Sequence, residues 1–132
     1  MEKQILVPSK IENLRSVEKF VDEISAECKL NSELYGNVLI ATLEAANNAI
    51  VHGNKLNENE NVKISSIIKD KILIITIEDT GKGFDYKNIP DPTSPENIEN
   101  VSGRGIFLME KLSDKIDFQK NGSLVFLYFN LK

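Results

Sequence analysis

Three polar side chains share one helical line in a segment that is otherwise almost entirely apolar. Glu44, Asn48 and His52 follow one another at intervals of four residues in and just after the apolar run Val38–Val51, a spacing that places them on one face of a helix. A helix that is apolar nearly all round is expected to be buried, and an unpaired carboxylate is costly to bury. We therefore expect Glu44 to line a wet cleft or to meet a partner. The alternative interpretations are a structural polar network and the exposed stripe of the helix. We expect His52 to close the helix.

A second motif follows an apolar segment rich in isoleucine. Asp79 comes at the end of this segment, and Gly81 and Gly83 come after it. Glycines permit backbone conformations barred to other residues and let a ligand approach closely. Asp79 would then present a hydrogen-bond acceptor at the end of a strand. The alternative interpretation is an ordinary glycine-rich turn.

A third motif, Gly103-Arg104-Gly105, precedes a further apolar pattern. We expect Gly105 to open a helix, whose free N–H groups and dipole favour a phosphate. Arg104 adds a positive charge that can bind phosphate oxygens in bidentate fashion. The motif lacks the spacing of a Walker A loop and of a dinucleotide-binding fingerprint. Glycines before a helix are common, so the motif is weak when it stands alone.

Together the three motifs supply the groups that a nucleotide needs. The carboxylate of Glu44 can act as a base, and the amide carbonyl of Asn48 can bind Mg²⁺, which prefers oxygen ligands and bridges substrate phosphates. Asp79 can accept a hydrogen bond from an amino group, and the glycines before the last helix can hold phosphates. A nucleotide is the ligand that would contact all of these groups.

The elements that must position these residues are predicted from periodicity and turn signals. An apolar stripe repeating at three and four residues indicates a first helix that ends near Cys28, with Ser9 and Glu12 as its capping box. Asn31 or Ser32 is expected to cap a second helix, and Gly53 to end it in a left-handed conformation. Alternation and β-branched residues predict strands, and turn residues at 69–71 and 121–122 predict hairpins between them. The strands are expected over residues 3–8, 62–68, 72–78, 115–120 and 123–131.

Strands joined mostly as hairpins and interrupted by helices predict an α+β fold. We expect a two-layer sandwich in which a mostly antiparallel mixed sheet is covered on one face by about three helices. The polar stretch 85–102 contains three of the four prolines, and a loop of this length inside a compact domain is usually functional or mobile. The apolar stripe of the first helix is compatible either with a core or with a partner.

Composition limits the classes of protein. The chain has 132 residues, 27% of them charged, and a net charge of −4, which is typical of one globular domain over residues 1–132 and argues against a direct nucleic-acid binder. The single cysteine, Cys28, predicts no internal disulfide and no zinc cluster. We find no signal peptide and no apolar run of membrane length. The sequence therefore predicts a cytoplasmic protein that binds neither membrane nor nucleic acid.

The three motifs, in this order and spacing, resemble the N, G1 and G2 boxes of the GHKL (Bergerat-fold) ATPase and kinase superfamily. The likeness is strongest to the anti-sigma factor serine/threonine kinases, the switch kinases of bacterial partner-switching systems. It extends through nearly the whole chain, because Pro8-Ser9, the segment 44–53, Asp79–Phe84, Pro90-Asp91-Pro92 and Gly103–Met109 all resemble the family's pattern.

This resemblance implies a role for each motif residue. Glu44 would be the general base, Asn48 the Mg²⁺ ligand, and the segment 85–102 the ATP lid. Asn47 stands beside Asn48, but the spacing from Glu44 favours Asn48. The resemblance implies a nucleotide site with adenine contacts from Asp79, Gly81, Gly83 and Ser123, and phosphate contacts from Gly103, Arg104 and Gly105.

The resemblance also implies an activity and partners. Histidine kinases of the superfamily usually have asparagine at the position of Glu44, whereas a hydroxyl acceptor gains from a positioned base. We therefore expect a protein serine kinase that uses ATP and Mg²⁺ to phosphorylate a STAS-domain antagonist, and that otherwise binds a sigma factor, as a homodimer. The alternatives are a non-catalytic ATP-gated binding module and a free-standing ATPase.

Overall fold

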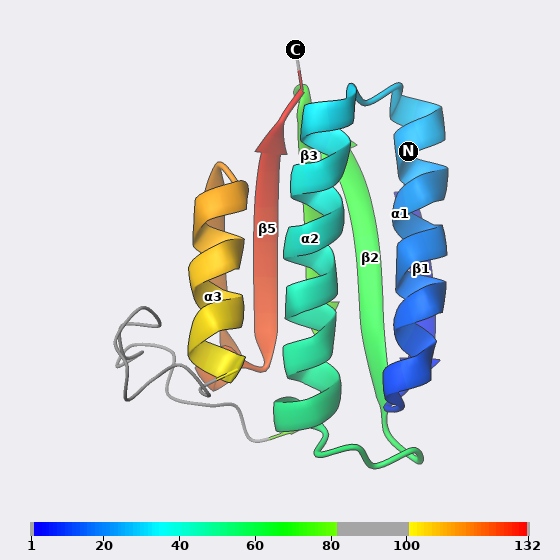
Figure 1. The fold of residues 1–132 in the computed structure, drawn as a ribbon, viewed down its shortest axis with the longest axis vertical. Coiled ribbons are helices and arrows are strands. Elements are labelled where there is room, and N and C mark those ends of the chain that lie inside the picture. Colours follow the sequence, from blue (N-terminus) through cyan, green and yellow to red (C-terminus); the bar gives the residue numbers. More distant parts are fainter. Residues whose placement is uncertain (1, 82–100, 132) are drawn as a thin grey trace.

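The computed structural model describes residues 2–81 and 101–131. Within these residues five strands form one sheet in the order β1-β2-β3-β5-β4, and every neighbouring pair is antiparallel. Three helices, α1 (Leu14–Cys28), α2 (Ser32–Asn48) and α3 (Val101–Leu112), lie on one face of this sheet (Figure 1). The α+β two-layer prediction is therefore confirmed. The strands are β1 (Glu2–Pro8), β2 (Asn61–Lys69), β3 (Ile72–Glu78), β4 (Lys115–Gln119) and β5 (Leu124–Asn130).

Both predicted hairpins are present. Asp70 and Lys71, which join β2 to β3, have φ angles of 54° and 62°, as a two-residue turn needs if it is to match the twist of its strands. The connection from β4 to β5 is a short 3₁₀ turn, Lys120–Gly122, in which Asn121 and Gly122 also have positive φ. The turn residues thus set the register of β2 against β3 and of β4 against β5.

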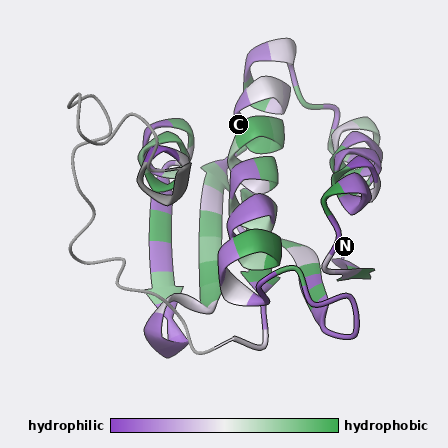
Figure 2. Cartoon of the chain, turned by 60° about the horizontal axis from the view of Figure 1, so that its bottom comes forward, coloured by the Kyte–Doolittle hydropathy of each residue, from purple (hydrophilic) through white to green (hydrophobic). Residues whose placement is uncertain are grey.

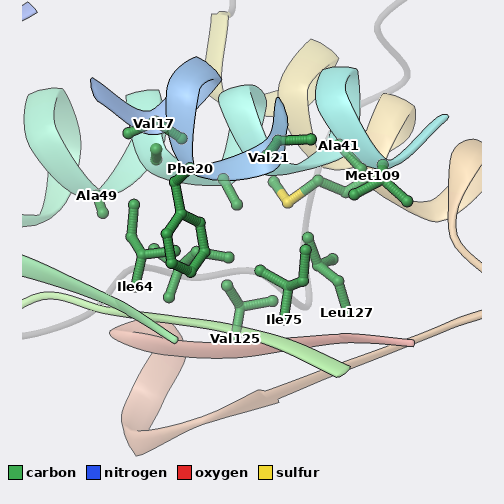
Figure 3. Close-up of a cluster of buried hydrophobic side chains, with 14 of the residues drawn as sticks. Val17, Phe20, Val21, Ala41, Ala49, Ile64, Ile75, Met109, Val125 and Leu127 are labelled. Atoms are coloured by element: carbon green, nitrogen blue, oxygen red, sulfur yellow. The ribbon is translucent and has the colours of Figure 1, made fainter. Parts of the chain in front are cut away.

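The apolar stripe of α1 (Leu14–Cys28) faces the chain's own core. Val17, Phe20, Val21 and Ile24 are almost fully buried, and Figure 2 shows that α1 is otherwise largely hydrophilic. The stripe is therefore not available to a partner. Figure 3 shows Val17, Phe20 and Val21 on the helical side of the core, opposite side chains of the sheet that include Ile64, Ile75, Val125 and Leu127.

The predicted capping box at the start of α1 is wrong. A short 3₁₀ turn, Ile11–Asn13, precedes the helix, and no side chain caps either element. Ser9 is instead fully buried, and its hydroxyl donates a hydrogen bond of 2.7 Å to the main-chain oxygen of Glu60. Tertiary contacts therefore compete successfully with the local cap.

The two ends of α2 (Ser32–Asn48) differ in how well the sequence predicts them. Asn31 caps the first turn as expected, since its Oδ1 accepts from the main-chain N–H of Leu34 at 2.8 Å. After Asn48 the helix continues as a π turn, Ala49–Gly53, a feature that is frequent at functional sites. Gly53 is not among the described residues with positive φ, so the predicted left-handed ending is wrong.

The last helix starts earlier than predicted. α3 runs from Val101 to Leu112, so Gly105 lies inside it and not at its beginning. The predicted lid, 85–102, and Gly83 lie outside the described residues except for Val101 and Ser102, which belong to α3. No helix in the described part of the chain is long and apolar enough to cross a membrane.

Candidate functional site

The carboxyl-terminal half of α2 meets α3 at a glycine. A Cβ atom built on Gly105 would lie 3.1 Å from Oε2 of Glu44 and 3.2 Å from Nδ2 of Asn48. Both distances are tighter than ordinary van der Waals contacts. Gly105 therefore allows the carboxylate and the amide to lie against the backbone of α3, and the structure brings together the residues that the first and third motifs predict.

Asn48 is buried but has no hydrogen-bond partner. Its residue is 5% exposed, and neither Nδ2 nor Oδ1 is bonded to any described group. Leaving a buried polar group unsatisfied costs about 1–3 kcal/mol, and such groups are uncommon in folded proteins. Among the described residues the amide of Asn48 is therefore a buried polar group without a partner.

Glu44, one turn before Asn48, is partly buried at the same junction. Burial raises the pKa of its carboxyl group, and the positive charge of Arg104 on α3 opposes this shift. Arg104 is itself exposed. A carboxylate whose pKa is raised from its ordinary value is a better proton acceptor in neutral solution.

Asp79 follows the last residue of β3 and is 7% exposed. Its main-chain N–H donates to the oxygen of Ser123 at 2.9 Å, and its Oδ1 accepts from the N–H of Gly81 at 2.8 Å. Burial raises the pKa of Asp79 to about 6, although the Gly81 hydrogen bond acts in the opposite direction. The other carboxylate oxygen accepts no hydrogen bond from the described residues, so it can accept one from a ligand.

Two glycines let the Asp79 turn pack against the π turn. A Cβ on Gly53 would lie 2.3 Å from Cγ of Asp79, and a Cβ on Gly81 would lie 2.1 Å from the main-chain oxygen of Gly53. Neither position can hold a side chain without movement of its neighbours. The sequence predicts a close approach for Gly81 but assigns Gly53 only to a helix end.

A cavity of about 10 Å³ lies between Asn48 and the Asp79 turn. It has room for about one water molecule. Asn48, Asp79 and Ser123 contribute its polar lining, and the hydroxyl of Ser123 donates to the oxygen of Lys120 at 2.9 Å. The mixture of an apolar wall and a few convergent polar groups is typical of small-molecule sites. The apolar wall consists of Ala45, Ala49, Ile77, Met109, Phe118 and Val125.

The remaining predicted residues are less closely connected to this cavity. His52 is exposed on the π turn, whose wider winding takes it out of the line that an unbroken α-helix would give. Gly103 belongs to α3. Sequence analysis missed Asn54, a buried residue directly after the π turn, because an asparagine after a helix is normally an ordinary loop residue.

This combination of fold and site defines a class of ATP-using domain. The family described as "Histidine kinase-like ATPase domain" matches residues 7–129, which is nearly the whole chain. The chain therefore belongs to the histidine kinase-like ATPase family, and the predicted family is confirmed.

Within this family the chain is similar to serine-protein kinase RsbW of Staphylococcus aureus. Over 95 residues it is 38% identical to RsbW of strains JH9 and Newman, a match that covers 64% of this chain and 58% of the relative. The fold also matches a crystal structure of the RsbU and RsbW domains of Rv1364c from Mycobacterium tuberculosis. That match has a TM-score of 0.70 and 17% identity, and it covers 99% of this chain and 32% of the other.

Proposed function

We propose that this chain is an ATP-dependent protein serine kinase that also acts as an anti-sigma factor. The observation that carries the proposal is the junction at Gly105, where Glu44 and an unsatisfied Asn48 lie together beside a cavity that Asp79 also lines. Similarity to a protein named as a serine-protein kinase supports the choice of acceptor.

Asp79 is the proposed adenine contact. Its free carboxylate oxygen would accept a hydrogen bond from the adenine amino group, while Gly81 and Gly83 shape the turn around the base and Ser123 lines the cavity beside Asp79. An adenine ring is larger than the cavity of about 10 Å³, so binding requires side chains to rearrange. Met109 is suited to this because its side chain is unbranched and flexible.

Asn48 is the proposed Mg²⁺ ligand. Its buried, unsatisfied oxygen is of the type that Mg²⁺ prefers, and this ion normally completes its shell with water and substrate phosphates. Among the described residues no group of three or more His, Cys, Asp or Glu side chains is placed to hold a metal, so a site shared with the nucleotide fits this chain. When bound, Mg²⁺ would neutralise part of the phosphate charge.

Glu44 is the proposed general base. Its carboxylate would take the proton from the serine hydroxyl of the acceptor as the hydroxyl oxygen bonds to the γ-phosphorus and the bond to ADP breaks. Gly103, Arg104 and Gly105 would face the phosphates, with Arg104 supplying positive charge. The segment 85–102 would serve as the lid over the nucleotide.

The proposed partners are a STAS-domain antagonist, as phosphate acceptor, and a sigma factor, with the protein acting in the cytoplasm.

We also propose a homodimer. The stripe of α1 is buried, so the dimer would use the sheet face opposite the helices, where Ile67, Ile74 and Tyr128 are adjacent in register and only partly buried. Sedimentation of the wild type and Ile74→Asp tests this: a wild-type monomer would contradict it.

Calorimetry with Mg²⁺ and ATP on the wild type and Asp79→Asn tests the nucleotide site. We expect micromolar-range binding by the wild type and its loss in the variant, because the amide would place an N–H group toward the adenine amino group. A wild type that does not bind ATP would overturn the proposed function. Transfer of labelled phosphate to a STAS-domain protein then separates the kinase from an ATP-gated binding module and from a free-standing ATPase.

A further inference from the structure

Asn54 forms a hydrogen-bonded connection behind the Asp79 turn. Its residue is 6% exposed, and its Nδ2 donates to Oγ of Ser9 at 3.0 Å and to the main-chain oxygen of Asn61 at 3.2 Å. Its Oδ1 accepts from the main-chain N–H of Thr80 at 2.9 Å. Both hydrogens and the carbonyl oxygen of this amide are therefore engaged.

The partners determine the orientation of the amide. A main-chain N–H can only donate, so the atom facing that group of Thr80 is the oxygen. A main-chain carbonyl can only accept, so the atom facing Asn61 is the nitrogen. Reversing the amide would break both bonds, and the side chain therefore holds one fixed arrangement.

One end of this connection leads to the proposed adenine contact. Thr80 lies between Asp79 and Gly81, and the N–H of Gly81 donates to Oδ1 of Asp79. The residue before Asn54 is Gly53, whose backbone is in close contact with both the Asp79 carboxyl group and Gly81. The position of the Asp79 carboxylate thus depends on how the π turn and Asn54 hold the segment from Asp79 to Gly81.

The other end of the connection leads away from the site. Ser9 and Asn61 lie at the ends of β1 and β2 that pair beside each other, and the hydroxyl of Ser9 donates to the oxygen of Glu60. The side chain of Glu60 returns to the turn, because its Oε2 lies 2.7 Å from Oγ1 of Thr80. The same network therefore has two sides. Ser9 and Asn61 form the scaffold side at the strand ends, and Thr80 forms the side at the Asp79 turn.

We propose that Asn54 is a positioning residue for adenine recognition. It acts through Thr80 by fixing the turn that presents the Asp79 carboxylate to the base. This inference rests on the proposed nucleotide site and adds to it a residue that sets base specificity from outside the pocket.

The preference for ATP over ITP tests this role. ITP carries an oxo group where adenine has its amino group, so the ratio of the ATP and ITP affinities reports the Asp79 contact. The contribution of the phosphates is the same in both affinities and cancels in their ratio. We expect Asn54→Ala to reduce this ratio by about tenfold, since a misplaced acceptor loses most of a hydrogen bond to a charged group. Both affinities are measured by calorimetry on protein shown to be folded by circular dichroism.

Ser9→Ala is the matched control. It removes bonds from the scaffold side of the same network and is expected to lower the thermal midpoint while leaving the ATP to ITP ratio within about twofold of the wild type. An unchanged ratio in Asn54→Ala, or an equal loss in Ser9→Ala, would overturn the inference.

Thr80→Val keeps the test decisive if Asn54→Ala does not fold. Thr80 is exposed, so the variant should fold. The hydroxyl oxygen of Thr80 lies 2.7 Å from Oε2 of Glu60 and 3.1 Å from Oδ1 of Asn54, and removing it should lower the ratio by about threefold. Thr80→Ser, which keeps the hydroxyl, should retain the ratio, and equal ratios in the two variants would contradict the inference. A wild type that binds no ATP would overturn the proposed function itself, which distinguishes the two failures.

Discussion

Asn48 and Asn54 are the same residue type, are six positions apart and are equally buried, yet their environments are opposite. Asn54 uses both of its hydrogens and its oxygen within the chain, whereas neither polar atom of Asn48 has a partner among the described residues. A satisfied buried amide fixes a structure, and an unsatisfied one weakens it unless a ligand completes it. The comparison separates a region that holds the turn from the region that we propose to bind the nucleotide.

The largest expected effect concerns the ligand-facing region. Glu44→Gln keeps the size of the side chain but cannot accept a proton, so we expect phosphoryl transfer to fall by about 10²–10⁴-fold. Nucleotide affinity should change by no more than about threefold, because Glu44 is proposed to act on the acceptor. Single-turnover phosphorylation and calorimetry on the same preparation measure both. Equal transfer rates in the wild type and Glu44→Gln would remove Glu44 from the mechanism.

Alanine variants of two glycines, Gly53 and Gly36, test the packing of the π turn against the Asp79 turn. A Cβ at Gly53 would lie 2.3 Å from Cγ of Asp79, whereas a Cβ at Gly36 in α2 would meet nothing within 4 Å. We expect Gly53→Ala to destabilise the protein by about 1–3 kcal/mol and to weaken ATP binding. Gly36→Ala should stabilise it by up to about 1 kcal/mol through helix propensity. Urea unfolding gives both values, and similar behaviour of the two variants would contradict the close approach at Gly53.

Matched alanine variants test the comparison of the two asparagines directly. Asn54→Ala loses the hydrogen bonds of its side chain to Ser9, Asn61 and Thr80 and should cost about 2–3 kcal/mol of unfolding free energy. Asn48→Ala removes unsatisfied groups, so its cost should stay within about 1 kcal/mol, while the dependence of ATP binding on Mg²⁺ should disappear. Urea unfolding and calorimetry with and without EDTA measure these effects. A larger loss of stability in Asn48→Ala would show that its amide has a structural role.

The elements of this fold are largely predictable from local sequence. The period of the apolar residues in α1, the Asn31 cap and the turn residues between strands are local signals, and the structure confirms each of them. The capping box at Ser9 failed because its hydroxyl bonds to Glu60, a residue 51 positions away. Such a partner is not visible in local spacing.

The candidate site was predictable only in part. Motif spacing identified Glu44, Asn48 and Asp79, which the structure brings near one another, but it did not identify Asn54 or the role of Gly53. Those residues matter because the π turn places them against Asp79 and Thr80. Helix periodicity predicts a regular continuation at this point, so the change of winding and its consequences appear only in three dimensions.

The smallest expected effect is the pH dependence of the contribution that Asp79 makes to stability. Burial raises the pKa of Asp79 from 3.8 to about 6 in the folded protein, so the native state binds a proton more tightly than the unfolded chain. The contribution of Asp79 to stability is therefore full below about pH 3.8 and is lost as the pH rises through about 6. Other carboxyl groups also titrate, so the quantity to compare is the difference between the wild type and Asp79→Asn.

ATP binding should depend on pH in the opposite direction. In the proposed site the ionised carboxylate of Asp79 would accept a hydrogen bond from the adenine amino group, and protonation would turn its free oxygen into a donor, so affinity should fall as the pH decreases through about 6. Calorimetry with ATP and ITP between pH 5 and pH 8, a range chosen to bracket the pKa of about 6, separates this effect from titration of the phosphates, which both nucleotides share. If the ATP to ITP ratio is constant across that range, the ionisation of Asp79 does not control adenine recognition, and the turn that Asn54 holds would serve the fold alone.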